Sequence, residues 1–195
     1  MFFRDVKPKE GVTLDVALAN VHLPVKLGHR DAHKLFAEPL KQQLAVAALG
    51  TVLDCRNRTW ANGQVKGVDI YLGLRDPSQD GLLTVARMLD ALAAPCGSSI
   101  RLADGIGAPV LFGRTEGLEL SISSDAAPDG DARRDLAGTC KEAIEQIGVS
   151  RGWDTADDRT VFYFYGEDFE EMKARLGRVL SDHPSYGNAL LRRVA

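Results

Sequence analysis

The sequence predicts an α+β protein made of two ferredoxin-like units in tandem. Each unit has the element order βαββαβ, with an antiparallel sheet that carries its helices on one face. Two observations support this: the same order of strands and helices is found in each half, and the segment GVDIYLG of the first half corresponds to TVFYFYG of the second. We expect the first unit at 1–104, a linker at 105–115 and the second unit at 116–195. A single, less regular α/β domain is the alternative.

In the first half, alternation of apolar and polar residues predicts a strand over 12–23. Pro39 suits a first helical turn, and the apolar spacing after it predicts a helix over 38–49. Ser78 is a suitable cap for a second helix. The remaining expected elements are strands at 50–60 and 64–74 joined by the turn residues ANG, the capped helix at 76–94 and a strand at 98–103.

The second half repeats this order. The expected elements are a strand at 117–123, a helix at 129–148, strands at 149–155 and 159–166, a helix at 167–183 and a strand at 188–195. Phe169, Met172 and Leu176 recur at helical spacing and mark the buried side of the last helix. The repeated order therefore extends to the end of the chain.

The strand at 159–166 has five consecutive large apolar or aromatic residues, whereas a strand with one wet face should alternate. Aligning Gly73 with Gly166 places Phe162 and Phe164 on the face without helices, as an exposed apolar patch that indicates a partner. Two other arrangements stay open. A register shifted by one residue would bury both phenylalanines, and the two units could cover each other.

Charge is uneven along the chain, with a net charge of +3 over 1–115 and −8 over 116–182. The acidic turn at 154–158 has no helix dipole to account for it, and an acidic loop beside aromatics suits a basic protein surface. A solvated charged face is the alternative. The predicted partner-binding residues are Asp154, Asp157, Asp158, Phe162 and Phe164, with Tyr71 and Asp69 at the corresponding positions of the first unit.

The search for catalytic and metal-binding patterns gives no site. His29 and His33 are four residues apart, but Arg30 stands where a metalloprotease helix carries glutamate, and no third ligand is evident. The segment DGIGAP lacks the third glycine of a dinucleotide-binding turn. We therefore predict no catalytic residues, no cofactor and no metal.

Composition narrows the functional classes further. The net charge of −3 gives no argument for nucleic acid or an anionic membrane, and no stretch has the apolar length of a membrane span. The N-terminus is charged within four residues, which is unlike a signal peptide. Three widely spaced cysteines indicate reduced thiols. We expect a cytoplasmic protein.

Four segments carry a resemblance to a known group of proteins: AALGTVLDC, NGQVKGVDIYLGLRD, ALAAPCGSSIRL and TVFYFYGEDFEEM. Over residues 38–195 the chain resembles a family of uncharacterised bacterial α/β proteins that is itself similar to toxin-immunity proteins. It departs from that family at Leu53–Arg56 and at Ser185–Gly187. The resemblance implies a non-catalytic protein that neutralises a bacterial toxin by covering its active site.

Three functions are consistent with the sequence. The first is an immunity protein whose partner toxin has a basic active-site surface. The second is a small-molecule-binding regulatory module with paired ferredoxin-like units. The third is an enzyme whose site no linear motif reveals. The absence of catalytic motifs and the acidic second half favour the first.

Overall fold

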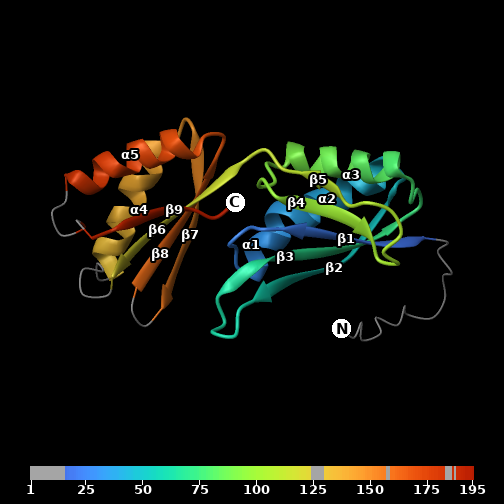
Figure 1. Cartoon of the computed structure of the whole chain (residues 1–195), viewed down its shortest axis with the longest axis horizontal. Helices are drawn as coiled ribbons and strands as arrows, with labels where there is room; N and C mark the ends of the chain where they lie inside the picture. The colour runs from blue at the N-terminus through green and yellow to red at the C-terminus, as the bar shows by residue number, and fades with distance from the viewer. Residues whose placement is uncertain (1–15, 124–129, 157–158, 183–185, 187) are drawn as a thin grey trace.

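The computed structural model describes residues 16–123, 130–156, 159–182, 186 and 188–195, and in it the chain forms two α+β units side by side (Figure 1). The first unit contains β1 (Ala17–Leu23), the helical run α1 (His29–Ala32), η1 (His33–Ala37) and α2 (Glu38–Val46), then β2 (Gly50–Thr59), β3 (Val65–Leu74), α3 (Gln79–Ala91), β4 (Ser98–Leu102) and β5 (Val110–Phe112). The second contains β6 (Glu116–Ser123), α4 (Gly130–Ile144), β7 (Gly148–Ala156), β8 (Arg159–Gly166), α5 (Phe169–Ser181) and β9 (Leu190–Arg193).

The strand orders are those of ferredoxin-like units. The first sheet has the order β2-β3-β1-β4-β5 and the second β7-β8-β6-β9, with antiparallel pairing throughout. Each sheet packs one face against its own helices, as in the core made by Leu40 and Leu89 with Ile70. The predicted fold class, two tandem βαββαβ units, is therefore confirmed. One strand was not expected: β5 forms within the stretch predicted to link the units, and it extends the first sheet beside β4.

The first helix begins earlier than the sequence indicated, at His29 instead of residue 38. It passes through a wide π turn, in which the backbone N–H of Glu38 bonds to the carbonyl of His33, five residues back. Pro39 follows this turn inside the helical run and does not mark its start. Pro39 has no N–H to donate to the preceding turn, and the π turn is where the regular hydrogen-bond ladder is already interrupted.

The placement of Phe162 and Phe164 on an exposed face is wrong. Both are fully buried among the helices of the second unit. The alignment of Gly73 with Gly166 fails because the two glycines lie on opposite faces of their sheets. A side chain at Gly166 would contact Met172 of α5, whereas one at Gly73 would contact Leu53 on the helix-free side. The register shifted by one residue is therefore the correct one.

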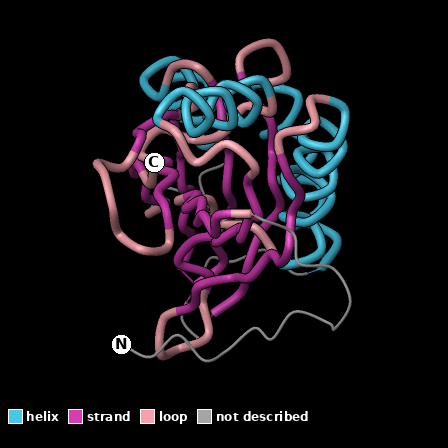
Figure 2. Tube along the Cα trace, turned by 90° about the vertical axis from the view of Figure 1, so that its right-hand side faces the viewer, coloured by secondary structure: helices cyan, strands magenta, loops and turns pink. Residues whose placement is uncertain are grey.

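The two units also cover each other, because the helix-free face of the second sheet lies against the first unit. Tyr165 is 3% exposed and belongs to the core of the first unit, where its hydroxyl accepts a hydrogen bond from the backbone N–H of Lys26 at 2.8 Å. Glu119, on the same face, is 5% exposed and pairs with Arg192 at 2.7 and 2.9 Å. Figure 2, a view along the long axis, shows the helices along the top and one side, with the strands beside and below them.

Candidate functional site on the helix-free face of the first sheet

Two rows of side chains cross the helix-free face of the first sheet. The pairing registers place one residue from each of β2, β3, β1 and β4 in each row. The first row is Arg56, Asp69, His22 and Ser99, and the second is Asp54, Tyr71, Asn20 and Arg101. We call these eight residues the polar face. None of them is aliphatic, and the alternate positions on the same strands point into the core, as the alternation of a half-buried sheet requires.

Asp69 is the centre of the first row. Its carboxylate lies 2.8 Å from Nδ1 of His22 and 3.8 Å from Nε of Arg58, and its side chain is only 13% exposed. A carboxylate withdrawn from water in this way needs partners of opposite charge or hydrogen-bond donors. Asp69 therefore supports its neighbours and contributes little free negative charge to the surface.

The second row contains a tyrosine, on which an arginine of the first row stacks, and an unused acceptor. Arg56 bonds to Asp54 at 2.5 Å, and its guanidinium lies 5.6 Å from the centre of the Tyr71 ring, within cation–π range. Next to Tyr71, Oδ1 of Asn20 is buried and has no hydrogen-bond partner among the described residues. A buried acceptor without a partner costs free energy, which a donor from outside could recover.

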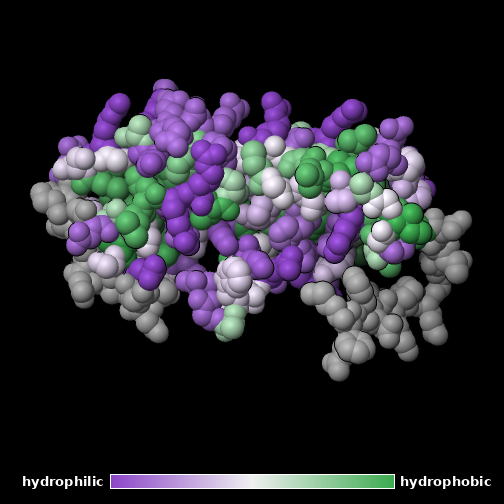
Figure 3. Space-filling model, in the orientation of Figure 1, coloured by the Kyte–Doolittle hydropathy of each residue, from purple (hydrophilic) through white to green (hydrophobic). Residues whose placement is uncertain are grey.

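The accessible charge on this side of the molecule is positive. The side chains of Arg56 and Arg58 are 59% and 44% exposed, and Arg101 is also exposed, whereas Asp69 is mostly covered. Figure 3 shows hydrophobic and hydrophilic residues interleaved over the surface in this view, with hydrophilic side chains densest along the helical edge at the top. The polar face therefore combines cationic groups, one aromatic ring and an open acceptor.

Ser99, His22 and Asp69 share one row, but they do not form a hydrolytic triad. Oδ1 of Asp69 accepts a hydrogen bond from Nδ1 of His22 at 2.8 Å. The other side of the ring lies against Gly67 on β3, where an added Cβ would be 2.9 Å from Cε1. Ser99 stands on β4, the other neighbour of β1. A nucleophile and its base must be within hydrogen-bond reach, and this orientation turns the base away from the serine.

The predicted site residues are divided between three places. Asp69 and Tyr71 lie on the helix-free face of the first sheet, as expected. Asp154 is exposed on β7 of the second unit, whereas Asp157 and Asp158 lie outside the described residues. Phe162 and Phe164 are core residues. The predicted acidic and aromatic patch on the second unit is therefore not formed as expected.

The sequence analysis missed the other members of the polar face. Asp54 and Arg56 flank the buried Cys55 along β2, and Asn20 and His22 flank the buried Val21 along β1. That period-two pattern was the signal that could have identified them.

The other chemically interesting groups give no catalytic or metal centre among the described residues. The rings of His29 and His33 are 6.4 Å apart, and no group of three or more potential metal ligands is found in the described part of the chain. Burial raises the pKa of Cys55 to about 11 and that of Cys140 to about 12, so both thiols stay protonated at neutral pH.

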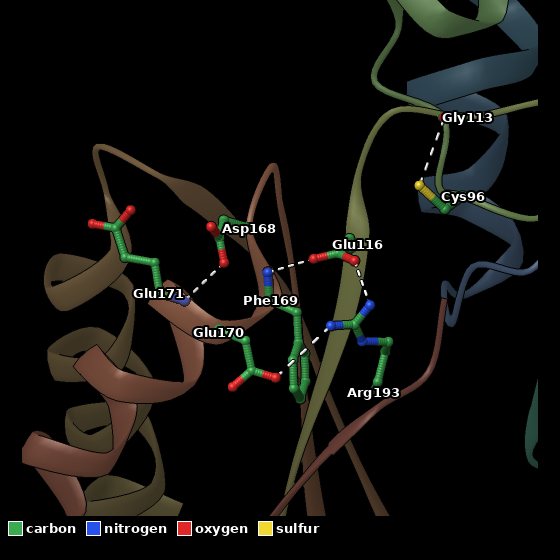
Figure 4. Close-up of polar contacts among 8 residues, drawn as sticks. All are labelled: Cys96, Gly113, Glu116, Asp168, Phe169, Glu170, Glu171 and Arg193. Carbon is green, nitrogen blue, oxygen red and sulfur yellow. Dashed lines mark hydrogen bonds and ion pairs between the residues drawn. The ribbon is translucent and has the colours of Figure 1, made fainter.

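A second polar cluster holds the start of β6 to α5 and β9 (Figure 4). Glu116 accepts the backbone N–H of Phe169 at 2.6 Å and pairs with Arg193 at 2.5 Å, while Asp168 caps the helix through the N–H of Glu171. Arg193 also lies 4.5 Å from the centre of the Phe169 ring. Because these groups satisfy one another, the cluster stabilises the second unit and is not our candidate site.

Comparison with known proteins gives distant likeness only. No family model and no curated protein matches the sequence. Solved structures that resemble it include a protein of unknown function from Galdieria sulphuraria, at 12% identity and a TM-score of 0.28, with 91% of this chain and 95% of that chain covered. The regulatory subunit of aspartate kinase from Thermus thermophilus is also similar, at 15% identity and a TM-score of 0.29, with 90% of this chain and 97% of that chain covered. The same subunit from Thermus flavus has 13% identity and a TM-score of 0.29, with 88% of this chain and 94% of that chain covered. Likeness at this level carries no argument about what this chain binds.

The described residues include no helix that is long and apolar enough to cross a membrane. The candidate site is the helix-free face of the first sheet, where the arginine side chains are exposed.

Proposed function

We propose that this chain is a binding protein that takes a partner protein on the polar face. One observation carries the proposal: the corresponding face of the second sheet lies against the first unit, whereas the face of the first sheet presents arginines and a tyrosine to solvent. Arginine and tyrosine are the residues that most often supply binding energy at protein interfaces.

The charges indicate the chemistry of the partner. Arg56 and Arg58 are accessible but pair with Asp54 and Asp69, so the excess positive charge comes from Arg101, which is exposed. The complementary surface is therefore acidic and brings a hydrogen-bond donor to Oδ1 of Asn20. Association with such a surface weakens as salt screens the charges.

Neutralisation of a bacterial toxin is a separate proposal, which concerns the second unit and is supported by the resemblance of the sequence to toxin-immunity proteins. The basic toxin surface that we expect from the acidic turn would contact Asp154 and its neighbours on the second unit, away from the polar face. Co-expression with the protein encoded by the adjacent gene tests this proposal: protection of the cells supports it, and growth arrest regardless of co-expression contradicts it.

Binding of a small metabolite is a second candidate for the same face. The buried, unpartnered Oδ1 of Asn20 beside Arg101 favours it, because a ligand with a donor and a carboxylate would satisfy both groups. A rise in the melting temperature with a metabolite, lost in Asn20→Ala, would support this candidate. A flat response across a metabolite library would disfavour it.

The main proposal is tested by charge reversal on the polar face. Capture from a native lysate is compared for the wild type, Arg101→Glu, Tyr71→Ala and Arg87→Glu, the last being an exposed arginine on the helical side. We expect one protein to be retained by the wild type and Arg87→Glu, and at least tenfold less of it by the other two, which corresponds to about 1.4 kcal/mol or more. Equal retention by all four proteins would exclude the polar face as the binding surface.

A further inference from the structure

The outer edge of β2 adjoins a groove that the polar face does not account for. β2 is the first strand of the five-stranded sheet, and its outer side pairs with no other described strand. A groove of about 290 Å³ lies between residues 52–55 of β2 and one side of the helical run α1–η1–α2. Unpaired edge N–H and C=O groups are a template for another extended chain.

The helical wall of the groove is one regular stripe. His29, His33, Ala37 and Lys41 recur every four residues, one position after the buried stripe that contains Phe36 and Leu40. Because successive helical residues are rotated by about 100°, the second stripe faces sideways, past the edge of the sheet. The run therefore lies alongside β2, with the groove between them.

Two backbone irregularities adjoin this groove. The helix widens into its π turn at His33–Ala37, and β2 has a bulge at Leu53, between the pairs Val52–Leu72 and Asp54–Tyr71. Bulges and π turns are frequent next to functional sites, where they re-aim side chains. A bulge can also serve to protect an edge from pairing, so the irregularities alone do not identify a ligand.

The spacing of the wall matches an extended peptide. Residues four apart on a helix rise by about 6 Å, and side chains two apart on a strand are separated by about 6.7 Å. Three alternate side chains of a bound strand would therefore meet Lys41, Ala37 and His33 in turn. At the middle position the floor is small and apolar, made by Ala37 at 1% and Cys55 at 3% exposure.

Exposed polar side chains in the groove determine which residues the peptide should carry at the first and last of its three alternate positions. Both oxygens of Asp54 are occupied, by the backbone N–H of Cys55 at 2.8 Å and by Arg56 at 2.5 Å. Lys41 and His33 are exposed and supply a cation and an imidazole on either side of the apolar floor. Glu38 also lines the groove and opposes an acidic ligand, three residues before Lys41.

We propose that this groove binds an extended peptide segment of a partner protein by adding it as a strand beside β2, with an acidic residue, an apolar residue and a second acidic residue at alternate positions. Main-chain hydrogen bonds to β2 supply affinity, and the helical stripe supplies sequence preference. The inference goes beyond the polar face and does not depend on it.

Fluorescence polarisation with an end-blocked, labelled peptide Ser-Glu-Thr-Val-Thr-Glu-Ser tests the proposal. We expect saturable binding that weakens about threefold in Lys41→Gln and strengthens about twofold in Glu38→Gln, as for partly exposed ion pairs. Lys34→Gln, an exposed lysine on the solvent side of the same run, should bind as the wild type does. Because Lys34→Gln removes the same charge as Lys41→Gln, a loss of affinity in Lys41→Gln alone separates recognition in the groove from non-specific attraction.

The strand addition has its own test. N-methylation of every second backbone amide removes the hydrogen-bond donors along one edge of the extended peptide. Of the two peptides that can be made in this way, the one methylated on the edge that faces β2 should bind at least tenfold more weakly than the parent. Arg101→Glu and Tyr71→Ala should leave peptide binding unchanged, so failure of the polar face and failure of the groove are distinguishable. Absence of saturable binding, or equal affinity for both methylated peptides and the parent, would overturn the proposal.

Discussion

At Tyr165, a single hydroxyl group connects the two units. It accepts the backbone N–H of Lys26 at 2.8 Å, and the ring lies in the core of the first unit although it belongs to β8 of the second. Burial is the main reason that the pKa of Tyr165 is raised above its ordinary value, and the hydrogen bond from Lys26 opposes this in part. The buried hydroxyl is therefore held in its protonated form.

Tyr165→Phe should lower the free energy of unfolding by about 1–2 kcal/mol at pH 7, because the N–H of Lys26 loses its acceptor. It should also reduce the loss of stability at alkaline pH. In the unfolded wild type Tyr165 ionises near pH 10, whereas the folded protein keeps it protonated, so stability falls as pH rises above about 10, by at most about 1.4 kcal/mol per pH unit.

Urea denaturation between pH 7 and 11 measures both effects. Tyr71→Phe, on the polar face, is the matched control and should change stability by less than about 0.5 kcal/mol. A variant at position 165 that keeps the full alkaline decline of the wild type would show that Tyr165 does not contribute to it.

At the scale of the elements, two glycines contrast. Gly166 ends β8 under α5, where an added Cβ would lie 2.8 Å from Sδ of Met172 and would also meet the carbonyl of Ile147. Gly177 lies in the middle of α5, and an added Cβ would meet nothing within 4 Å. The same substitution should therefore have opposite effects at the two positions.

Gly166→Ala should destabilise the protein by about 1–3 kcal/mol, since the close contact with backbone leaves no room to adjust. Gly177→Ala should stabilise it by about 0.5–1 kcal/mol, because alanine loses less backbone entropy than glycine in a helix. Chemical denaturation of the two variants beside the wild type checks both signs. Destabilisation by Gly177→Ala would contradict this description of α5.

Elements with a clear period could be predicted from the sequence, and those without one could not. Helix α3 and its cap at Ser78, where the side chain accepts the N–H of Gly81 at 3.1 Å, follow from the apolar stripe and the capping residue. The start of the helical run at His29 is polar and gives no apolar stripe. β5 has only three residues, too few for a period to be visible.

The register of β8 shows a different limit. Five consecutive apolar or aromatic residues satisfy both faces of a strand equally, so the sequence alone could not decide which face received the phenylalanines. Tyr165 is buried by residues of the first unit, which lie more than a hundred positions away in the sequence. Only two of the eight residues of the polar face were predicted, because Asp69 and Tyr71 were placed by alternation and their neighbours on β2, β1 and β4 were not.

At the scale of the whole molecule, β8 belongs to two cores. Phe162 and Phe164 pack in the core of the second unit, and Tyr165 packs in that of the first. A strand shared in this way couples the units, because neither core is complete without it. We therefore expect the units to unfold together.

Two tryptophans allow this to be measured. Trp60 lies at the β2–β3 hairpin of the first unit and Trp153 lies beside Phe162 in the second, with ring centres 6.1 Å apart. The variant Trp153→Phe keeps only Trp60, which reports on the first unit, and Trp60→Phe keeps only Trp153, which reports on the second. The urea unfolding transitions measured by tryptophan fluorescence in the two variants should coincide within error. Tyr165→Ala, added to each, should separate them. Separate transitions without that change would show that the units are independent.

The order of the units along the chain has a consequence for synthesis. Apart from Tyr165, the core residues of the first unit lie between positions 19 and 110, so that unit can close while the ribosome is still adding the second. The second unit then emerges beside a first unit whose buried core lacks Tyr165, and its tyrosines and Glu119 can be withdrawn from water there. During translation the first unit would thus act as an intramolecular template for the second.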